Sequence, residues 1–238
     1  MRIAVIGDIH GNIHALVSVL EDITCRNVDC ILSTGDLVGY LPFPNEVIHL
    51  IRENRILSVQ GNHDYTIAMG KPLSKDDVLK LNARDLIAGA SAVFTNRVVT
   101  EDNRQYLSFL PENLRMTVGE YKLLLIHGSP RRIDEYMHDD LDLLESIVGG
   151  VQDDVIISGH THVPYHRIIQ GKHIINAGSV GKPKHGNANA TYIVIDIKGL
   201  ELEVEIYEVP YDVEKTATVV EQSNFFDPKL AGMLRQGY

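Results

Sequence analysis

Five short segments that carry aspartate, asparagine or histidine recur in the chain, each after an apolar stretch typical of a buried strand. Carboxylate, amide and imidazole groups suit divalent transition metals, whereas a set without thiolate disfavours copper(I) and iron–sulfur clusters. Any one segment is a weak signal, but the joint pattern predicts a metal site. The segments are Gly7–Asn12, Gly35–Tyr40, Gly61–Asp64, His127–Pro130 and Gly159–His162.

The spacing of these residues suggests how two metals could share ligands. Asp8 and His10 lie two residues apart, so in an extended segment they point to the same side and can share one metal. Asp36 can bridge two metals with its two oxygens, and Asn62 offers a neutral amide oxygen. Imidazoles come from His127, His160 and His162. Two metals about 3.5–4 Å apart are the usual arrangement for phosphoester hydrolysis, so this is the predicted chemistry.

The elements that position these residues begin with an alternation of strands and helices. Such a run predicts parallel strands with right-handed crossovers, and ligands gather at the carboxyl ends of such strands. The expected strands are 2–6, 28–32 and 56–59, and the expected helices are 12–26 and 44–54.

The stretch around residues 65–114 breaks this rhythm with a mainly helical pattern, with helices expected at 76–94 and 101–110. It is either an insertion that shapes substrate access or simple cover for one face of a sheet. Later turn signals such as Gln170-Gly171 predict antiparallel hairpins. The tail, 224–238, is weakly patterned and is expected to fray or to form a lid. Without repeats or linkers, residues 1–238 are interpreted as one domain.

The remaining strands are expected at 115–118, 122–126, 155–158, 165–169, 173–176, 192–197 and 201–209, and the remaining helices at 140–148 and 213–222.

Composition narrows the class of protein. The net charge of −10 disfavours extended binding to nucleic-acid backbones, although bound metals can reverse the local field for a phosphate substrate. No run approaches the roughly 18 apolar residues of a membrane span, and residues 1–6 resemble a strand more than a signal peptide. Cys25 and Cys30 form no disulfide framework, so we expect a cytoplasmic protein with reduced thiols. The sequence carries no signal for an oligomeric state.

The segments resemble the calcineurin-like metallophosphoesterase superfamily, whose pattern is D-x-H, G-D, G-N-H, a separate His and G-H-x-H. The resemblance covers about the first 180 residues. It implies an α/β fold, a four-layer α-β-β-α sandwich with two packed mixed sheets. It also implies two divalent metal ions, manganese first and iron, nickel, zinc or cobalt as alternatives. The first metal would be held by Asp8, His10, Asp36 and His162, and the second by Asp36, Asn62, His127 and His160.

The resemblance also implies catalytic roles for the third segment. His63 matches the family's non-ligand histidine, which contacts the substrate phosphate and protonates the leaving group, and Asp64 would orient it by a hydrogen bond. The expected mechanism is in-line attack on phosphorus by a metal-bridging hydroxide. Substrate contacts are expected from Asn12, Arg131 and Lys182, with His185 nearby, although a solvated surface position is an equal alternative for Arg131 and Lys182.

Departures from the family pattern narrow the expected class of substrate. Protein serine/threonine phosphatases carry an arginine soon after the second motif and a glutamate after G-N-H, and this chain has neither. Residues 176–183 are similar to the N-x-G-S-x-G segment of the small prokaryotic phosphodiesterase branch. We therefore expect hydrolysis of small phosphodiesters or phosphomonoesters, with nucleotides as candidates.

Three alternatives stay open. One is a hydrolase of dinucleoside polyphosphates. Another is a non-catalytic scaffold like the retromer trafficking subunit, which lacks the catalytic histidine, so His63 argues against it. The third is a nuclease, which the acidic charge disfavours.

Overall fold

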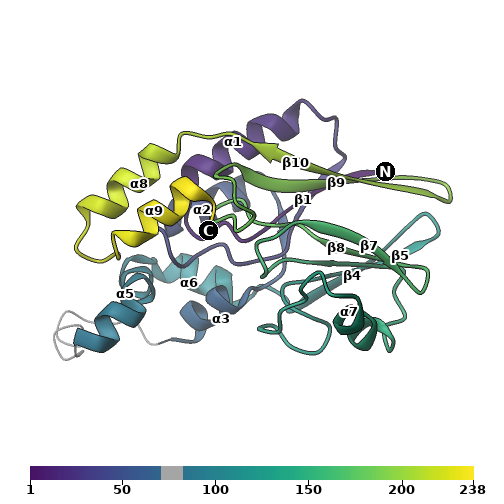
Figure 1. The fold of residues 1–238 in the computed structure, drawn as a ribbon, viewed down its shortest axis with the longest axis horizontal. Helices are drawn as coiled ribbons and strands as arrows, with labels where there is room; N and C mark the ends of the chain where they lie inside the picture. Colours follow the sequence, from purple (N-terminus) through teal and green to yellow (C-terminus); the bar gives the residue numbers. More distant parts are fainter. Residues whose placement is uncertain (71–82) are drawn as a thin grey trace.

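Two five-stranded mixed sheets lie face to face in the computed structural model, which describes residues 1–70 and 83–238, with side chains described for 1–70 and 91–238 (Figure 1). The first sheet has the order β10-β9-β1-β2-β3 and the second the order β4-β5-β6-β8-β7. Among the described residues, no helix has the length and apolar content that crossing a bilayer requires.

The first sheet begins with the predicted alternation of strands and helices. Strands β1, β2 and β3 pair in parallel, and α1 and α2 make the two crossovers. Strands β9 and β10 extend the sheet as an antiparallel hairpin beside β1. The bounds are β1 Arg2–Ile6, α1 Ile13–Thr24, β2 Cys30–Ser33, α2 Pro44–Glu53, β3 Leu57–Ser58, β9 Ala190–Lys198 and β10 Glu201–Val209.

The second sheet has three parallel strands at its centre, β5, β6 and β8, with β4 and β7 antiparallel at the edges. The hairpins expected in the later half of the chain are confirmed at β7–β8 in this sheet and at β9–β10 in the first sheet. The bounds are β4 Asn113–Val118, β5 Tyr121–Ile126, α7 Leu141–Val148, β6 Val155–Ser158, β7 Tyr165–Ile169 and β8 Lys172–Asn176.

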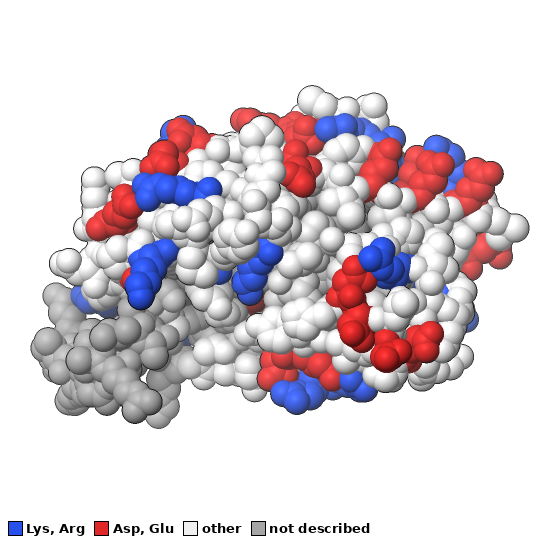
Figure 2. Space-filling view, viewed as in Figure 1, with Lys and Arg blue, Asp and Glu red and all other residues white. Residues whose placement is uncertain are grey.

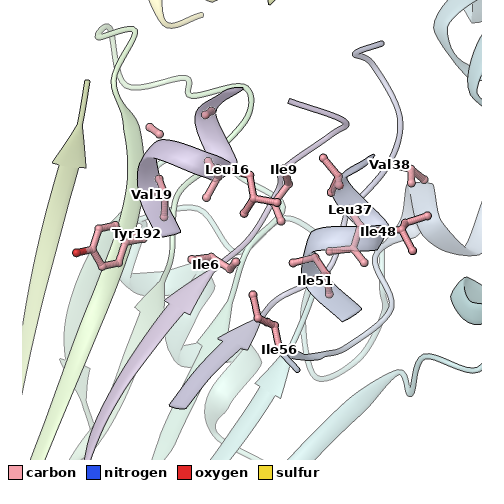
Figure 3. Close-up of a cluster of buried hydrophobic side chains, with 14 of the residues drawn as sticks. Ile6, Ile9, Leu16, Val19, Leu37, Val38, Ile48, Ile51, Ile56 and Tyr192 are labelled. Atoms are coloured by element: carbon pink, nitrogen blue, oxygen red, sulfur yellow. The ribbon is translucent and has the colours of Figure 1, made fainter. Parts of the chain in front are cut away.

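Alternating side chains of β1 explain the layers. Ile3 and Val5 face the second sheet and pack in the cluster that contains Leu123, whereas Ala4 and Ile6 face the helices. Figure 3 shows apolar side chains of α1 and α2 gathered over Ile6 and Tyr192 on this outer face. Helix α7 covers the outer face of the second sheet. The structure thus confirms the α-β-β-α sandwich.

Helices α3, α5 and α6 lie between β3 and β4 in the chain. Arg104 on α6 donates hydrogen bonds to backbone carbonyls of Ile67, Gly70 and Asn96, which ties the three helices together. The expected helix start at residue 76 lies outside the described residues, and α5 runs four residues beyond the expected end at 94. The bounds are α3 Asn62–Met69, α5 Ala83–Val98 and α6 Glu101–Ser108.

The C-terminal tail does not fray, so this half of the expectation was wrong, and the alternative of a lid stays a prediction. After α8 (Val213–Gln222) it forms α9 (Lys229–Gln236), which packs against α8 through buried Leu230 and Leu234, and Phe226 before the helix joins the same cluster. The amide of Gly186 donates to the carbonyl of Gly237 at 3.0 Å, so the tail ends against the loop between β8 and β9.

Candidate metal centre

The carboxyl ends of five strands meet at one edge of the sandwich and bring all of the predicted metal ligands together. Asp8, Asp36 and Asn62 follow β1, β2 and β3 of the first sheet. His10 also follows β1, whereas His127, His160 and His162 follow β5 and β6 of the second sheet. Groups of three candidate ligands have donor atoms within 4.8 Å of one another, namely Asp8, His10 and His162, then His10, Asp36 and His63, then Asp36, His127 and His160.

The backbone at these residues is strained. Five of the predicted ligands have a left-handed φ between 50° and 66°, a conformation that non-glycine residues seldom adopt. Each costs on the order of 1 kcal/mol, and such strain persists where surrounding contacts hold the chain in place. The five are Asp8, His10, Asp36, His160 and His162. Their clustering at one site indicates that the loops are shaped for function.

The first cluster of candidate metal ligands consists of Asp8, His10 and His162, and their lone pairs face one another. His10 Nδ1 lies 3.1 Å from the Val38 carbonyl and His162 Nδ1 lies 2.6 Å from the Lys182 carbonyl. A carbonyl only accepts, so both Nδ1 atoms donate and both Nε2 atoms carry lone pairs. These Nε2 atoms are 3.1 Å apart, and Asp8 Oδ1 lies 3.2 Å from that of His162. Acceptors that converge without a donor fit a bound cation.

The second cluster repeats this arrangement. His127 Nδ1 donates to the Thr34 carbonyl at 2.9 Å, and His160 Nε2 donates to the Asp134 carbonyl at 3.3 Å. The remaining nitrogens, His127 Nε2 and His160 Nδ1, face each other at 3.1 Å. Asn62 Oδ1 lies 2.9 Å from His127 Nε2. A second cation fits here for the same reason.

Asp36 lies between the two clusters. Its Oδ2 atom is 3.7 Å from His10 Nε2 and 3.4 Å from His127 Nε2. Burial raises the pKa of Asp36, but His127 and the other imidazoles outweigh burial and hold the pKa well below its usual value. Asp36 is therefore an anion placed to touch both cations.

The charges around His127 and His160 shift the pKa values of the two rings in opposite directions. Burial lowers the pKa of His127, but Asp36 and Asp8 oppose it and raise the pKa to about 9. Burial and the charge of His127 lower the pKa of His160 to about 4. The two pKa values thus move in opposite directions because the rings lie close together beside two carboxylates, and a divalent cation between the facing nitrogens would satisfy both.

His63 lies beside this centre in the first turn of α3. Its backbone N–H donates to Asp36 Oδ1 at 2.8 Å, and its ring centroid lies 5.1 Å from that of His10 and 4.7 Å from that of Tyr40. Gly39, with φ +93°, makes room because a Cβ there would lie 2.7 Å from His63 Nδ1. The ring nitrogens of His63 bond to no other described group, so they are available to a substrate.

Asp64 does not orient His63, so the expected hydrogen bond between them was wrong. Asp64 is fully buried, and its carboxylate accepts three backbone N–H groups, from Leu37, Val38 and Gly61 at 2.9, 3.2 and 3.0 Å. Burial and the charge of Asp36 raise the pKa of Asp64 to about 7 against these donors. The side chain ties the loop that carries Asp36 to the start of α3.

Replacing Asp64 by asparagine should weaken metal binding. The new amide would place an N–H against at least one backbone N–H, which loosens the loops that carry Asp36 and Asn62. We expect metal affinity, measured by calorimetric titration, to fall by roughly 10–100-fold. Unchanged affinity with a loss of turnover alone would instead support a direct role for Asp64 in catalysis.

Asn12 is not placed to contact a substrate, so its predicted role is corrected. It is fully buried, and Nδ2 donates to the Gly181 carbonyl and the Tyr211 hydroxyl at 2.9 and 3.0 Å. Oδ1 accepts from the Ala15 amide and the Thr216 hydroxyl. With every hydrogen-bonding atom engaged, Asn12 caps α1 and joins it to the loop after β8 and to α8.

The exchange of Asn12 for alanine should therefore lower stability. It removes a helix cap and leaves buried polar partners unpaired, which costs roughly 2–4 kcal/mol of unfolding free energy. Urea denaturation measures this loss, and Asn54→Ala, at the exposed end of α2, should cost far less. Full stability together with a raised KM would return Asn12 to the substrate site.

The structure places the other two predicted substrate contacts differently. Arg131 is exposed and pairs with Glu135, with Nη2 2.6 Å from Oε1, which matches the solvated alternative. Lys182 is buried, and its Nζ lies 5.4 Å from the ring centroid of Tyr40, whose ring contacts that of His63. His185 lies near Glu208 on β10, with Nε2 3.8 Å from Oε1.

Three residues near the centre were not singled out in the sequence. Tyr40 contacts the rings of His10 and His63, each at a centroid distance of 4.7 Å. Tyr136 stacks on His160 at 4.0 Å, and Lys184 lies on the loop next to Lys182. Tyr40 is the last residue of the second segment, so its position in the sequence could have indicated a place at the site. Tyr136 and Lys184 lie outside the five segments, so the sequence contained no such indication for them.

The chain belongs to the calcineurin-like phosphoesterase superfamily, because residues 1–200 match the model of that superfamily's domain. Membership indicates a phosphoester hydrolase in general, and together with the clusters it supports binding of divalent metal.

Individual relatives and solved structures match most of the chain. A protein of Methanocaldococcus jannaschii is 33% identical over 228 residues, 90% of this chain and 89% of its own. The solved structure of a metallophosphoesterase from Sphaerobacter thermophilus has a TM-score of 0.84 at 29% identity and covers 100% of this chain and 99% of its own. A hypothetical protein from Pyrococcus horikoshii shares the fold, with a TM-score of 0.87 at 23% identity over 100% of this chain and 98% of its own.

Proposed function

We propose that the protein hydrolyses small phosphodiesters or phosphomonoesters with two divalent metal ions, manganese first among the candidates. The observation that carries this proposal is the pair of facing lone-pair clusters joined by Asp36. One metal would be held by Asp8, His10, Asp36 and His162, and the other by Asp36, Asn62, His127 and His160. When bound, the metals neutralise phosphate oxygens and supply an activated water near neutral pH.

His63 would serve as the proton donor to the leaving oxygen. Its backbone is fixed to Asp36, while its ring nitrogens are uncommitted and half-exposed beside the clusters. General acid catalysis of this kind contributes roughly 10²–10⁴-fold to a rate. Gly39 and Tyr40 keep the ring in this position from the neighbouring loop.

Several observations favour a small substrate and a cytoplasmic enzyme. The net charge of −10 opposes an extended nucleic-acid partner, and Figure 2 shows acidic and basic side chains interspersed over one face, with no continuous basic surface among the described residues. Both cysteines are free, which suits a reducing compartment. The uncommitted ring of His63 and the complete donor set oppose a non-catalytic scaffold.

The test compares bis-p-nitrophenyl phosphate with p-nitrophenyl phosphate, using metal-stripped protein refilled with manganese, nickel, zinc or iron. We expect metal-dependent turnover, and the preferred ester distinguishes diesterase from monoesterase. Absence of turnover with every metal, in protein that has bound metal, would contradict the proposal.

A further inference from the structure

Two histidines outside the candidate metal centre face each other on the hairpin of β7 and β8. His166 lies on β7 and His173 on β8, and neither belongs to the groups of candidate ligands at the centre. His166 Nε2 lies 3.0 Å from His173 Nδ1, and the ring centroids are 5.1 Å apart with an angle of 11° between the ring planes. The pair is therefore a second place in the fold where imidazole nitrogens converge.

The backbone of the hairpin fixes this pairing. Gln170 and Gly171 have positive φ angles of 52° and 77°, as a two-residue hairpin turn requires, and such a turn sets the register of its strands. In this register His166 lies opposite Ile175, which is two residues along β8 from His173. The histidines are thus diagonal neighbours on one face of the hairpin, and long side chains at such positions reach each other.

Both rings lie at the border between the core and solvent. They share a face of the hairpin with Ile175, which packs in the cluster between the sheets, and both histidines are half-buried. Their other ring nitrogens, His166 Nδ1 and His173 Nε2, bond to no group in residues 1–70 or 91–238. Neither of these two atoms is among the buried polar atoms that lack a partner, so water reaches them.

The facing nitrogens can present two lone pairs to a cation. A neutral imidazole carries one proton, which either of its nitrogens can hold. In the hydrogen bond between the rings, one facing nitrogen holds a proton, but both protons can instead sit on the nitrogens that water reaches. Burial lowers the pKa of both rings, and the charge of His173 lowers the pKa of His166 further. Both rings are therefore neutral at pH 7, the form that binds metal.

The spacing and chemistry of the pair suit one class of cation. Zinc binds imidazole nitrogen at about 2.0–2.1 Å, so two nitrogens in adjacent coordination positions lie about 3 Å apart. Imidazole suits zinc, nickel and copper, whereas manganese and magnesium prefer oxygen ligands. Among the described residues, no third histidine, cysteine or carboxylate completes a group of donor atoms within 4.8 Å around this pair, so water would fill the remaining positions.

We propose that His166 and His173 bind one zinc, nickel or copper(II) ion, in addition to any metal at the candidate metal centre, and that this ion fastens β7 to β8. Strand β7 is at the edge of the second sheet and pairs only with β8. An edge strand has one row of backbone groups without a partner strand. An ion held by one side chain from each strand joins the two strands, whatever reaction the protein catalyses.

The first test counts the nickel ions that each chain binds at neutral pH, by equilibrium dialysis and plasma emission. The wild type should bind one ion more than the double variant His166→Gln/His173→Gln, because glutamine supplies no imidazole nitrogen. Each single variant keeps one imidazole and should bind the additional ion at least roughly tenfold more weakly. Equal nickel content in the wild type and the double variant would overturn the site.

The matched control is His49→Gln, which removes an exposed histidine that pairs with Glu53 on α2. It should bind as many nickel ions as the wild type and with the same affinity. If His49→Gln lost the additional ion as the double variant does, nickel would be binding to exposed histidines in general, and the site on the hairpin would be wrong.

The second test needs no variant for the site itself. Crystals of the wild type soaked in nickel should give an anomalous peak between His166 Nε2 and His173 Nδ1, and a map without this peak would contradict the proposal. Nickel should also slow amide hydrogen exchange in β7 of the wild type and leave the double variant unchanged. If exchange in the wild type did not respond to nickel, the ion would not fasten the strand.

Discussion

The variant Asp36→Ala is expected to lose turnover by at least roughly 10³-fold, together with most of its bound metal. Asp36 lies between both clusters, 3.7 Å from His10 Nε2 and 3.4 Å from His127 Nε2, so its loss removes a ligand from each site. It also removes the acceptor that fixes the backbone of His63. Metal content by plasma emission and turnover of bis-p-nitrophenyl phosphate check both losses.

A matched control for this variant is Asp139→Ala. That carboxylate is exposed and pairs with Arg167, away from the clusters. It should keep full metal content and full turnover. If Asp36→Ala bound two metals per chain like the control, the bridging position assigned to Asp36 would be wrong.

The second large effect is expected from His63→Ala, which should lower turnover by roughly 10²–10⁴-fold and leave metal content unchanged. Its ring lies within reach of His10 and Asp36, so a ligand role is the competing assignment. Both ring nitrogens are free of other partners, and a proton donor needs this freedom, whereas the predicted ligands each use one nitrogen to bond a carbonyl.

Metal content therefore decides between the two roles of His63. The control His49→Ala removes an exposed histidine that pairs with Glu53 on α2, and it should change neither metal content nor turnover. Loss of one metal in His63→Ala would make His63 a ligand. Full turnover in that variant would exclude it from proton transfer.

The sequence predicted most strands and helices because their signals are local, whereas the sandwich followed from the resemblance to the family. Strand β1 matches the expected range, and the ligands follow strands whose apolar runs are unbroken. The segment from Asn62 was placed only at a strand end, yet it begins α3, because the Asp64 carboxylate bonds the Gly61 amide at the helix start. The weak pattern of the tail hid α9, since a short helix on the surface buries only one narrow face.

The errors at the site have a common physical cause. Asp64 follows His63 on a helix, and successive helical side chains point about 100° apart, so neighbours in sequence do not face each other. Asn12 lies in a metal-binding segment, but its side chain turns into the core to cap α1. The backbone of Lys184 lies beside the centre only through the tertiary fold, since its amide bonds to the carbonyl of His162. Sequence proximity predicts which loop holds a residue, but not where its side chain points.

The most direct test of the account is an anomalous-difference map from crystals of the manganese-loaded protein. Two peaks are predicted on either side of Asp36, one touching His10 and His162 and the other touching His127 and His160. A single peak, or peaks that leave the facing nitrogens of these histidines without metal, would contradict the two-metal site.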